Sequence, residues 1–394
     1  MENTTFDFDA VIDRRGTSCL KYDFAAERGY PEGILPFWVA DMDFRAPEPV
    51  LEELQRRVAH GIFGYTDPKP EYKKTVIQWM EKHHRWSPSP EELVVTPGVV
   101  FAICTAVRAY TKPGDGILLQ QPVYYPVREA ILQNGRHLVD SPLILQDGHY
   151  KMDFEDMDQK MREHQVKLFL LCSPHNPVGR VWTREELLRT AELCERYDVY
   201  IVADEIHHEF VRPGHLHTVL ASLSPQIAER TITCTSASKT FNLAGLQVSN
   251  IFIRNSSLRR RFCAELSASG YSQPNALGLF ATEAAYKGGS AWLSALLGYL
   301  EENIRRTREF LTRELPEVRL IEPEGTYLLW LDCSAVGLTA EQLDRVIVER
   351  GNLWLDSGRI FGHAGEGFQR INMACPWSVL KNGLEHLKLA LRDR

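Results

Sequence analysis

Short runs of apolar and β-branched residues alternate with segments of helical periodicity through the middle of this chain. The clearest runs lie at 93–96, 116–120, 167–172, 199–204 and 231–234, and each is followed by a polar or Pro/Gly-rich segment. This alternation predicts an α/β fold in which helices wrap a mostly parallel sheet. A chain of 394 residues also exceeds the roughly 250–300 residues at which one core stops growing, so two domains are expected.

Helix signals lie between and after these runs. Thr183-Arg184-Glu185-Glu186 has the pattern of a capping box and predicts a helix that runs to about Tyr197. The pattern changes after about Ala285, with a long helix expected around 293–315, strands near 327–331 and 369–373, and helices at 339–349 and 378–391. These elements predict a second, α+β domain, which is tightly joined to the first because no low-complexity linker separates them.

The segments after the five runs are expected to converge. In open α/β sheets, ligands bind outside the carboxyl ends of the strands. Residues 96–100, 121–125, 173–179, 204–208 and 235–239 should therefore line one pocket.

Lys239 stands in one of these segments, in Thr235-Ser236-Ala237-Ser238-Lys239-Thr240, after the strand-like run 231–234. A lysine amine that condenses with an aldehyde explains this setting, and the hydroxyls of Ser236 and Ser238 suit a phosphate. A lysine in an ordinary polar loop is the alternative on local pattern alone.

Two polar side chains in neighbouring segments could complete such a site. Asp204 ends a strand whose sequence pattern is typical of a buried strand, and a buried carboxylate needs a cation such as a protonated pyridine nitrogen. The alternative is that Asp204 caps the segment that follows it. Asn176, held between Pro174 and Pro177, could donate to a phenolate oxygen or form a local Asx turn.

The remaining two segments offer a phosphate nest and aromatic rings. Thr96-Pro97-Gly98-Val99-Val100 predicts a strand, a turn and a helix start whose free N–H groups can bind phosphate, although every βα turn shares some of this character. Tyr124 and Tyr125 follow another strand, where one ring could stack on a flat heteroaromatic ring or take part in ordinary packing.

Composition excludes several classes of partner. The net charge of -7 gives no basic footprint for nucleic acid or anionic membrane. The eight cysteines show no metal-like spacing and are expected to be reduced, no stretch approaches about 18 apolar residues, and the polar start Met1-Glu2-Asn3-Thr4-Thr5 lacks a signal-peptide pattern. We therefore expect a cytoplasmic protein with a small-molecule substrate.

Together, motifs along nearly the whole chain resemble one family, the fold-type I pyridoxal-phosphate (PLP) enzymes of the aminotransferase class I/II group, and most closely its MalY/PatB branch of cystathionine β-lyases and cysteine-S-conjugate β-lyases. The motifs are 37–44 (FWVADMDF), 63–66 (FGYT), 96–100 (TPGVV), 121–126 (QPVYYP), 173–179 (SPHNPVG), 203–207 (ADEIH), 236–247 (SASKTFNLAGLQ) and 370–372 (RIN). The resemblance implies an aspartate aminotransferase-like fold with a seven-stranded-type sheet. It also implies a large PLP-binding domain of residues 46–285 and a small domain of residues 1–45 and 286–394.

The resemblance implies roles for individual residues. Lys239 would hold PLP covalently, Asp204 would face the pyridinium nitrogen, Asn176 would bind the ring oxygen and Tyr124 would stack on the ring. Lys239, Tyr124 and Asp204 form the implied catalytic set.

Phosphate and substrate contacts are implied in the same way. The backbone at Val99 and Val100, with Ser236 and Ser238, would hold the phosphate, and Tyr65 would reach it from the second subunit of a homodimer. Arg370 would clamp the substrate α-carboxylate, with Ala40, Tyr125 and Asn176 as further substrate contacts. Without the resemblance, Arg370 would be an ion-paired surface residue.

Two departures from typical aminotransferases are characteristic of the lyase branch. His207 replaces the usual tyrosine three residues after the aspartate and belongs to the implied cofactor-binding set, and Gln247 replaces the usual arginine eight residues after the lysine. A metal site of His207, His208, Asp204 and Glu209 is not expected, because this spacing presents no evident common face.

The resemblance implies a lyase that cleaves cystathionine or S-substituted cysteines by α,β-elimination. Transamination shares every step up to the carbanion, and the residues themselves do not separate the two reactions. A regulator that uses the fold as a binding module is a further alternative. An NAD enzyme is disfavoured because no G-x-G-x-x-G opens a helix after a strand.

Overall fold

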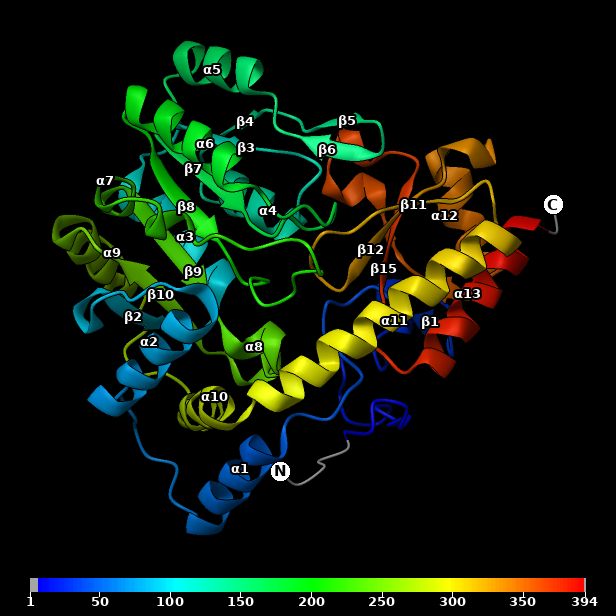
Figure 1. Ribbon diagram of the computed structural model, residues 1–394, viewed down its shortest axis with the longest axis horizontal. Helices are drawn as coiled ribbons and strands as arrows, with labels where there is room; N and C mark the ends of the chain where they lie inside the picture. The colour runs from blue at the N-terminus through cyan, green and yellow to red at the C-terminus, as the bar shows by residue number, and fades with distance from the viewer. Residues whose placement is uncertain (1–5, 393–394) are drawn as a thin grey trace.

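The structure is a computed structural model that describes residues 6–392. Figure 1 shows a large lobe around a twisted sheet and a smaller lobe that contains the C-terminus, with the 25-residue helix α11 (Ser290–Glu314) running from one to the other. Residues 1–5, on which the expectation of no signal peptide rests, lie outside the described residues.

Seven strands form the central sheet in the order β2-β10-β9-β8-β7-β3-β4. Their bounds are β2 (Leu93–Thr96), β10 (Ser249–Ile253), β9 (Thr231–Thr235), β8 (Tyr200–Asp204), β7 (Leu168–Cys172), β3 (Gly116–Leu119) and β4 (His137–Asp140). Strand β10 is antiparallel to both of its neighbours, and the other neighbouring pairs are parallel. The α/β fold and the five strands predicted from the sequence are confirmed, while β4 and β10 join them.

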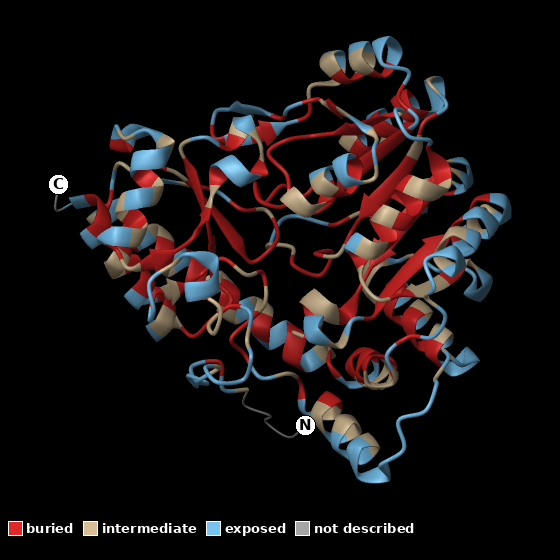
Figure 2. Cartoon of the chain, turned by 180° about the vertical axis from the view of Figure 1, so that it is seen from behind, coloured by how far each residue is buried: buried red, intermediate tan, exposed pale blue. Residues whose placement is uncertain are grey.

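Both faces of this sheet are covered, because successive side chains of a strand point to opposite sides. Leu168 and Leu170 of β7 belong to the cluster that includes residues of α3 (Val99–Tyr110), α4 (Tyr125–Gln133) and α9 (Ser256–Ala268). Phe169 and Leu171 belong to the cluster on the other face, with α5 (Phe154–Glu163) and α6 (Arg184–Arg196). Figure 2 shows the resulting buried strands between helices with exposed outer faces.

Helix α6 begins where the sequence predicts. The Thr183 hydroxyl accepts from the Glu186 N–H and the Glu186 carboxylate accepts from the Thr183 N–H, which is the expected capping box. The two contacts satisfy backbone donors that a helix start otherwise leaves without partners.

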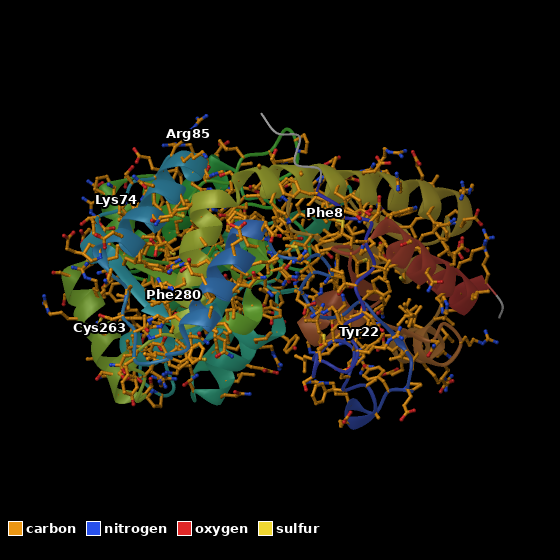
Figure 3. All side chains as sticks on the ribbon, turned by 90° about the horizontal axis from the view of Figure 1, so that it is seen from below. Phe8, Tyr22, Lys74, Arg85, Cys263 and Phe280 are labelled. Carbon is orange, nitrogen blue, oxygen red and sulfur yellow. The ribbon has the colours of Figure 1, made fainter. Side chains whose placement is uncertain are left out.

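The small lobe contains a four-stranded antiparallel sheet in the order β11-β12-β15-β14. Its elements are β11 (Arg319–Ile321), β12 (Leu328–Asp332), β14 (Asp356–Ser357), β15 (Phe368–Asn372), α12 (Ala340–Glu349) and α13 (Trp377–Arg392). Strand β1 (Leu35–Pro36) pairs in parallel with β13 (Leu353–Trp354), so the N-terminal segment packs against the C-terminal part of the chain. In Figure 3, Tyr22 accordingly lies on the small-lobe side, whereas Lys74 and Cys263 lie on the large-lobe side. The domain limits at 45/46 and 285/286 stay a prediction.

Three more helices pack at the base of the large lobe. Helix α10 (Ala276–Gly288) contacts α1 (Glu48–His60) and α2 (Pro70–His84). The connection between α1 and α2 carries exposed apolar side chains, with Ile62 74%, Phe63 60% and Tyr65 97% exposed. Within residues 6–392, no helix combines the length and apolar character needed to cross a bilayer.

Candidate active site

A cavity of about 200 Å³ lies where the central strands end. All five segments predicted to converge contribute to its wall, so that prediction is confirmed. The lining residues are Ala40, Pro97, Gly98, Val99, Val100, Phe101, Tyr124, Cys172, Asn176, Asp204, Ile206, His207, Ser238, Lys239, Ala244, Gln247, Val248 and Ser249.

Lys239 reaches the cavity from α8 (Ala237–Thr240), a short helix directly after β9. Its Nζ donates to the Ala40 carbonyl oxygen at 2.6 Å, and the Tyr327 hydroxyl donates to the same oxygen at 2.9 Å. Burial lowers the pKa of Lys239 to about 8, with Arg370 acting in the same direction and Asp41 and Asp204 opposing it. A large share of this amine is therefore neutral, and able to accept a proton, near pH 8.

Asp204 ends β8 and lines the cavity with a buried carboxylate. Its Oδ1 accepts from the Ile206 N–H at 3.2 Å, so the local capping contact considered above is present. Burial raises the pKa of Asp204 to about 6, which leaves the carboxylate ionised at pH 7. A buried anion in the cavity wall is suited to a cationic partner.

His207 faces the cavity as a neutral imidazole. Burial lowers its pKa well below the ordinary value, and the positive charges of Lys239 and Arg370 lower it further. Within the described part of the chain, its buried Nδ1 has no hydrogen-bond partner. This nitrogen is therefore available to a ligand in the cavity.

Arg370 lies on β15, is only 2% exposed, and contacts three other segments. Its Nη1 donates to Asn176 Oδ1 at 3.0 Å, its Nη2 donates to the Trp38 carbonyl oxygen at 2.8 Å, and it forms an ion pair with Asp356. Arg370 is thus ion-paired, but it is buried next to Asn176 rather than on the surface. It is not among the lining residues of the cavity itself.

The start of α3 forms the cavity end expected to bind phosphate. Gly98, Val99 and Val100 line the cavity there, and a Cβ added to Gly98 would meet no protein atom within 4 Å. The backbone N–H groups at this helix start thus border open space.

The two serines near Lys239 occupy different positions. Ser238 lines the cavity, whereas the Ser236 hydroxyl donates to the Val248 carbonyl oxygen at 2.7 Å and accepts from the Ser238 N–H at 3.0 Å. A hydroxyl has a single hydrogen, so Ser236 has none to donate to a phosphate in this arrangement. In this arrangement Ser236 caps α8, and its expected contact with a phosphate stays a prediction.

The three tyrosines of the predicted site lie in different surroundings. Tyr124 lines the cavity, and burial raises its pKa to about 12. Tyr125 begins α4, with its ring centroid 5.4 Å from that of Tyr124, but is not among the lining residues. Tyr65 lies in a separate hollow bordered by residues 63–66 and 270–277. Its own chain does not bring Tyr65 to the cavity.

Some residues of the site were not found from the sequence. Cys172, Phe101 and Val248 line the cavity, and Tyr327 shares the Ala40 carbonyl with Lys239. Cys172 ends a predicted strand and Phe101 follows the segment 96–100, so both could have been found from strand-end spacing. Tyr327 carried no signal beyond its place near a predicted strand.

The lining residues fit PLP. They combine an amine for the aldehyde, an ionised buried carboxylate for the pyridinium nitrogen, an unpartnered imidazole nitrogen, and a helix start beside open space. Each of these groups suits a different part of the same molecule.

Known proteins resemble the chain over almost its whole length. The family model described as aminotransferase class I and II matches residues 33–387. Cystathionine beta-lyase PatB of Bacillus subtilis is 45% identical over 384 residues, covering 98% of this chain and 99% of PatB. Protein MalY of Escherichia coli is 33% identical over 389 residues, covering 98% of this chain and 99% of MalY.

A solved structure supports the same relationship. The PLP-bound C-S lyase from Staphylococcus hominis superposes with a TM-score of 0.92 at 35% identity, covering 99% of both chains. The resemblance to the MalY/PatB branch is thereby confirmed. The chain belongs to the aminotransferase class I and II family of PLP-dependent enzymes.

Proposed function

We propose that this enzyme is a carbon-sulfur β-lyase, which cleaves cystathionine or S-substituted cysteines to a thiol, pyruvate and ammonia. The observation that carries the proposal is the 45% identity to a cystathionine beta-lyase over 98% of the chain. The cavity supports it, because the groups that α,β-elimination needs lie around one space.

PLP, when bound, withdraws electrons from the substrate α-carbon and so stabilises the negative charge left by the α-proton. Lys239 would hold the cofactor through its amine, Asp204 would keep the ring nitrogen protonated, and Tyr124 would pack on the ring. The N–H groups at the start of α3 and the Ser238 hydroxyl would bind the phosphate. His207 and Asn176 would contact the ring substituents.

Lys239 also moves the proton. With its amine free, Lys239 would accept the substrate α-proton at Nζ. A pKa of about 8 supports this role, because a lysine near its ordinary value of 10.5 would be almost fully protonated at pH 7. The Ala40 carbonyl holds the amine through the 2.6 Å hydrogen bond.

Arg370 and Asn176 bind the substrate α-carboxylate. Their mutual contact at 3.0 Å supports this pairing, because it places an amide and a guanidinium side by side. As the carbon-sulfur bond breaks, the sulfur leaves with the bonding electron pair and becomes a thiol on protonation. Water then releases ammonia and leaves pyruvate, so the balance is substrate plus water to thiol, pyruvate and ammonia.

The test is a product assay over a panel of cysteine conjugates that includes cystathionine. A lyase releases thiol and pyruvate in equal amounts without any added acceptor. An aminotransferase, the alternative within this family, instead converts a keto-acid partner stoichiometrically and produces no pyruvate burst. Lys239→Ala provides the control, because it should abolish both turnover and the cofactor link that borohydride traps.

Under the same proposal, the enzyme is a homodimer, and it is located in the cytoplasm. Tyr65 supports the dimer, because its 97% exposed side chain lies on a surface with Ile62 and Phe63 and is free to reach a second subunit. The eight free cysteines support a reducing compartment. Mixing Lys239→Ala with Tyr65→Ala subunits tests the dimer, since a mixed dimer has one intact site and should regain activity. Sedimentation as a monomer would refute the dimer, and cell fractionation tests the location.

A further inference from the structure

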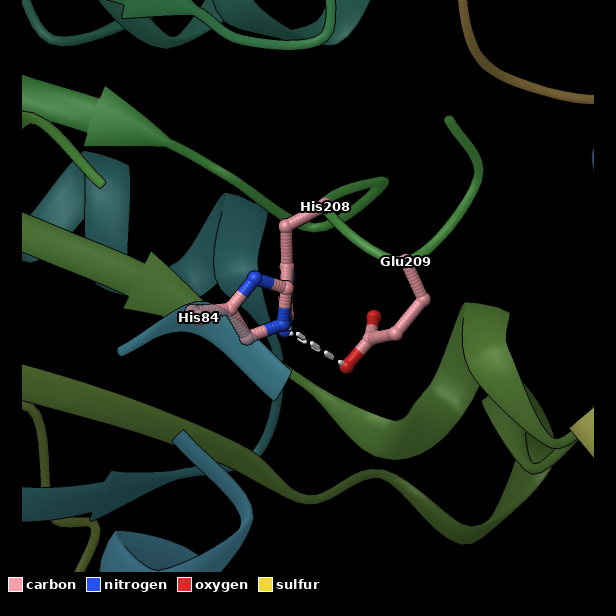
Figure 4. A group of neighbouring side chains, drawn as sticks. All are labelled: His84, His208 and Glu209. Atoms are coloured by element: carbon pink, nitrogen blue, oxygen red, sulfur yellow. Dashed lines mark ion pairs between the residues drawn. The ribbon is translucent and has the colours of Figure 1, made fainter. Parts of the chain in front are cut away.

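A second polar cluster lies behind the cavity, on the opposite side of the segment that follows β8. Asp204, Ile206 and His207 line the cavity, whereas His208 and Glu209 lie with His84 of α2, as Figure 4 shows. One short segment therefore supplies both the cavity wall and this buried group. His84 was not among the site residues predicted from the sequence.

The Glu209 carboxylate accepts hydrogen bonds from two different elements of the large lobe and forms a close ion pair with the adjacent His208. The Trp79 indole N–H of α2 donates to Oε1 at 2.7 Å, and the Thr240 hydroxyl of α8 donates to Oε2 at 2.7 Å. His208 Nε2 lies 2.7 Å from Oε1. The Glu209 side chain is only 2% exposed, so these contacts replace water as its partners.

His208 faces an oxygen acceptor with each of its ring nitrogens. Its Nδ1 contacts the Glu205 carbonyl oxygen and its Nε2 faces the Glu209 carboxylate, and both of these atoms are acceptors. Burial by itself lowers the pKa of His208, but Glu209 and Glu205 together outweigh it and raise that pKa. The result is a buried imidazolium-carboxylate pair.

The other titratable groups around the pair are accounted for. His84 Nε2 lies 3.6 Å from Glu209 Oε1, and burial lowers the pKa of His84 to about 4, so this ring is neutral at pH 7. Glu205 instead accepts from the Leu220 N–H at 3.0 Å and contacts His217 Nε2 at 3.0 Å. Glu209 is therefore the carboxylate that faces the charge of His208.

A proton fits between His208 and Glu209 better than a metal ion does. The ligand atoms of His84, His208 and Glu209 all lie within 4.8 Å of one another, which is compatible with a metal group. However, a tetrahedral ion with bonds of about 2.0–2.1 Å holds its ligand atoms about 3.3 Å apart. The 2.7 Å separation of Nε2 and Oε1 is too short for two ligands of one such ion and is that of a close ion pair.

The cluster connects to the chemistry through Thr240, which follows Lys239 in the four-residue helix α8. On the cavity side, Lys239 bonds to Ala40, and on the far side Thr240 bonds to Glu209. So short a helix has little packing of its own to fix its orientation. The two side-chain contacts hold α8 at two successive residues.

We propose that Glu209, paired with His208, is a positioning residue that fixes the helix carrying Lys239 through the Thr240 hydroxyl. This inference rests on the role of Lys239 in the proposed function. It gives a role to His208 and Glu209, the residues of the 204–209 segment that lie with His84. The partners that make it effective are Trp79, which ties Glu209 to α2, and Thr240, which ties it to α8.

The test compares Thr240→Val, Thr240→Ser and Glu209→Gln in the holoenzyme. Valine keeps the shape of threonine but removes the hydroxyl, and serine restores it. Thr190→Val is the matched control, because Thr190 is buried in α6 and its hydroxyl donates to the Glu186 carbonyl oxygen at 2.9 Å within the same helix. The measurements are kcat and KM for an S-substituted cysteine, the pH midpoint of the bound-cofactor absorbance, and the melting temperature.

Thr240→Val should lower kcat about tenfold or more with KM within about threefold, because a displaced catalytic group loses rate more than binding. It should also shift the absorbance midpoint, and Glu209→Gln should do the same. Thr240→Ser should restore both values, and Thr190→Val should match the wild type. Wild-type kcat and midpoint in a folded Thr240→Val enzyme would overturn the proposal, as would equal impairment by valine and serine.

The wild-type assay separates this outcome from failure of the proposed function. If the wild type converts a keto acid and releases no pyruvate, the lyase assignment fails. The absorbance midpoints of the Thr240 variants still report how Lys239 is held, so the positioning role is decided independently.

Discussion

Replacing Lys239 by methionine should stabilise the cofactor-free protein at neutral pH, and the gain should shrink as the pH rises. Burial lowers the pKa of this amine from 10.5 to about 8. One pKa unit corresponds to about 1.4 kcal/mol, so holding the buried ammonium costs on the order of 3 kcal/mol at pH 7. Methionine removes that cost but also loses the hydrogen bond to Ala40, worth about 1 kcal/mol, which leaves a net gain of about 2 kcal/mol.

The sign of the pH dependence follows from which state binds the proton. Between pH 8 and 10.5 the unfolded lysine is protonated while the folded one is mostly neutral, so the stability of the wild type rises with pH. The methionine variant lacks this contribution, and Asp204 and His207, whose pKa values the Lys239 charge lowers, titrate below pH 7 in the wild type. The stability difference should therefore fall by about 2 kcal/mol between pH 7 and pH 9.5.

Urea unfolding of both cofactor-free proteins, followed by tryptophan fluorescence at equal concentrations and several pH values, measures this difference. Lys74→Met is the control, because Lys74 is exposed on α2 and water solvates its ammonium. Its effect on stability should not change with pH over this range. A pH-independent difference for Lys239→Met would refute the reasoning, because it would mean that folding does not lower the pKa of Lys239.

Three further substitutions test other parts of the site and fold. Arg370→Lys should raise KM about tenfold or more in steady-state kinetics, because one ammonium cannot replace a planar guanidinium that contacts Asn176 and Asp356 together. An unchanged KM would contradict the role of Arg370 in binding the substrate α-carboxylate. Asp204→Asn should lower kcat about a hundredfold or more, since a neutral amide stabilises the ring proton poorly, and unchanged kcat with bound cofactor would exclude this role. Thr183→Ala should cost about 1 kcal/mol in urea unfolding without changing KM, because only a helix cap is lost.

The sequence was sufficient for five of the seven strands of the central sheet, the α6 cap and the convergence of five segments on one cavity. These features depend on local patterns and on one geometric rule, that parallel strands end at the same edge of a sheet. Lys239, Asp204, Asn176 and Tyr124 could be assigned because each lies within a few residues of a strand end. Their roles came from the family resemblance, since hydroxyls, amides and carboxylates at strand ends serve many sites.

The tertiary structure decided which groups meet across the chain. Lys239 shares the Ala40 carbonyl with Tyr327, over separations of 199 and 287 residues from Ala40, and Glu209 meets Trp79 across 130 residues. It also directed the Ser236 hydroxyl hydrogen to the Val248 carbonyl oxygen and buried Arg370 in an ion pair with Asp356. A pKa depends on burial and on neighbouring charges, and both are set by packing between distant segments. The chain by itself thus identifies the lysine, whereas the fold makes its amine neutral enough to act as a base.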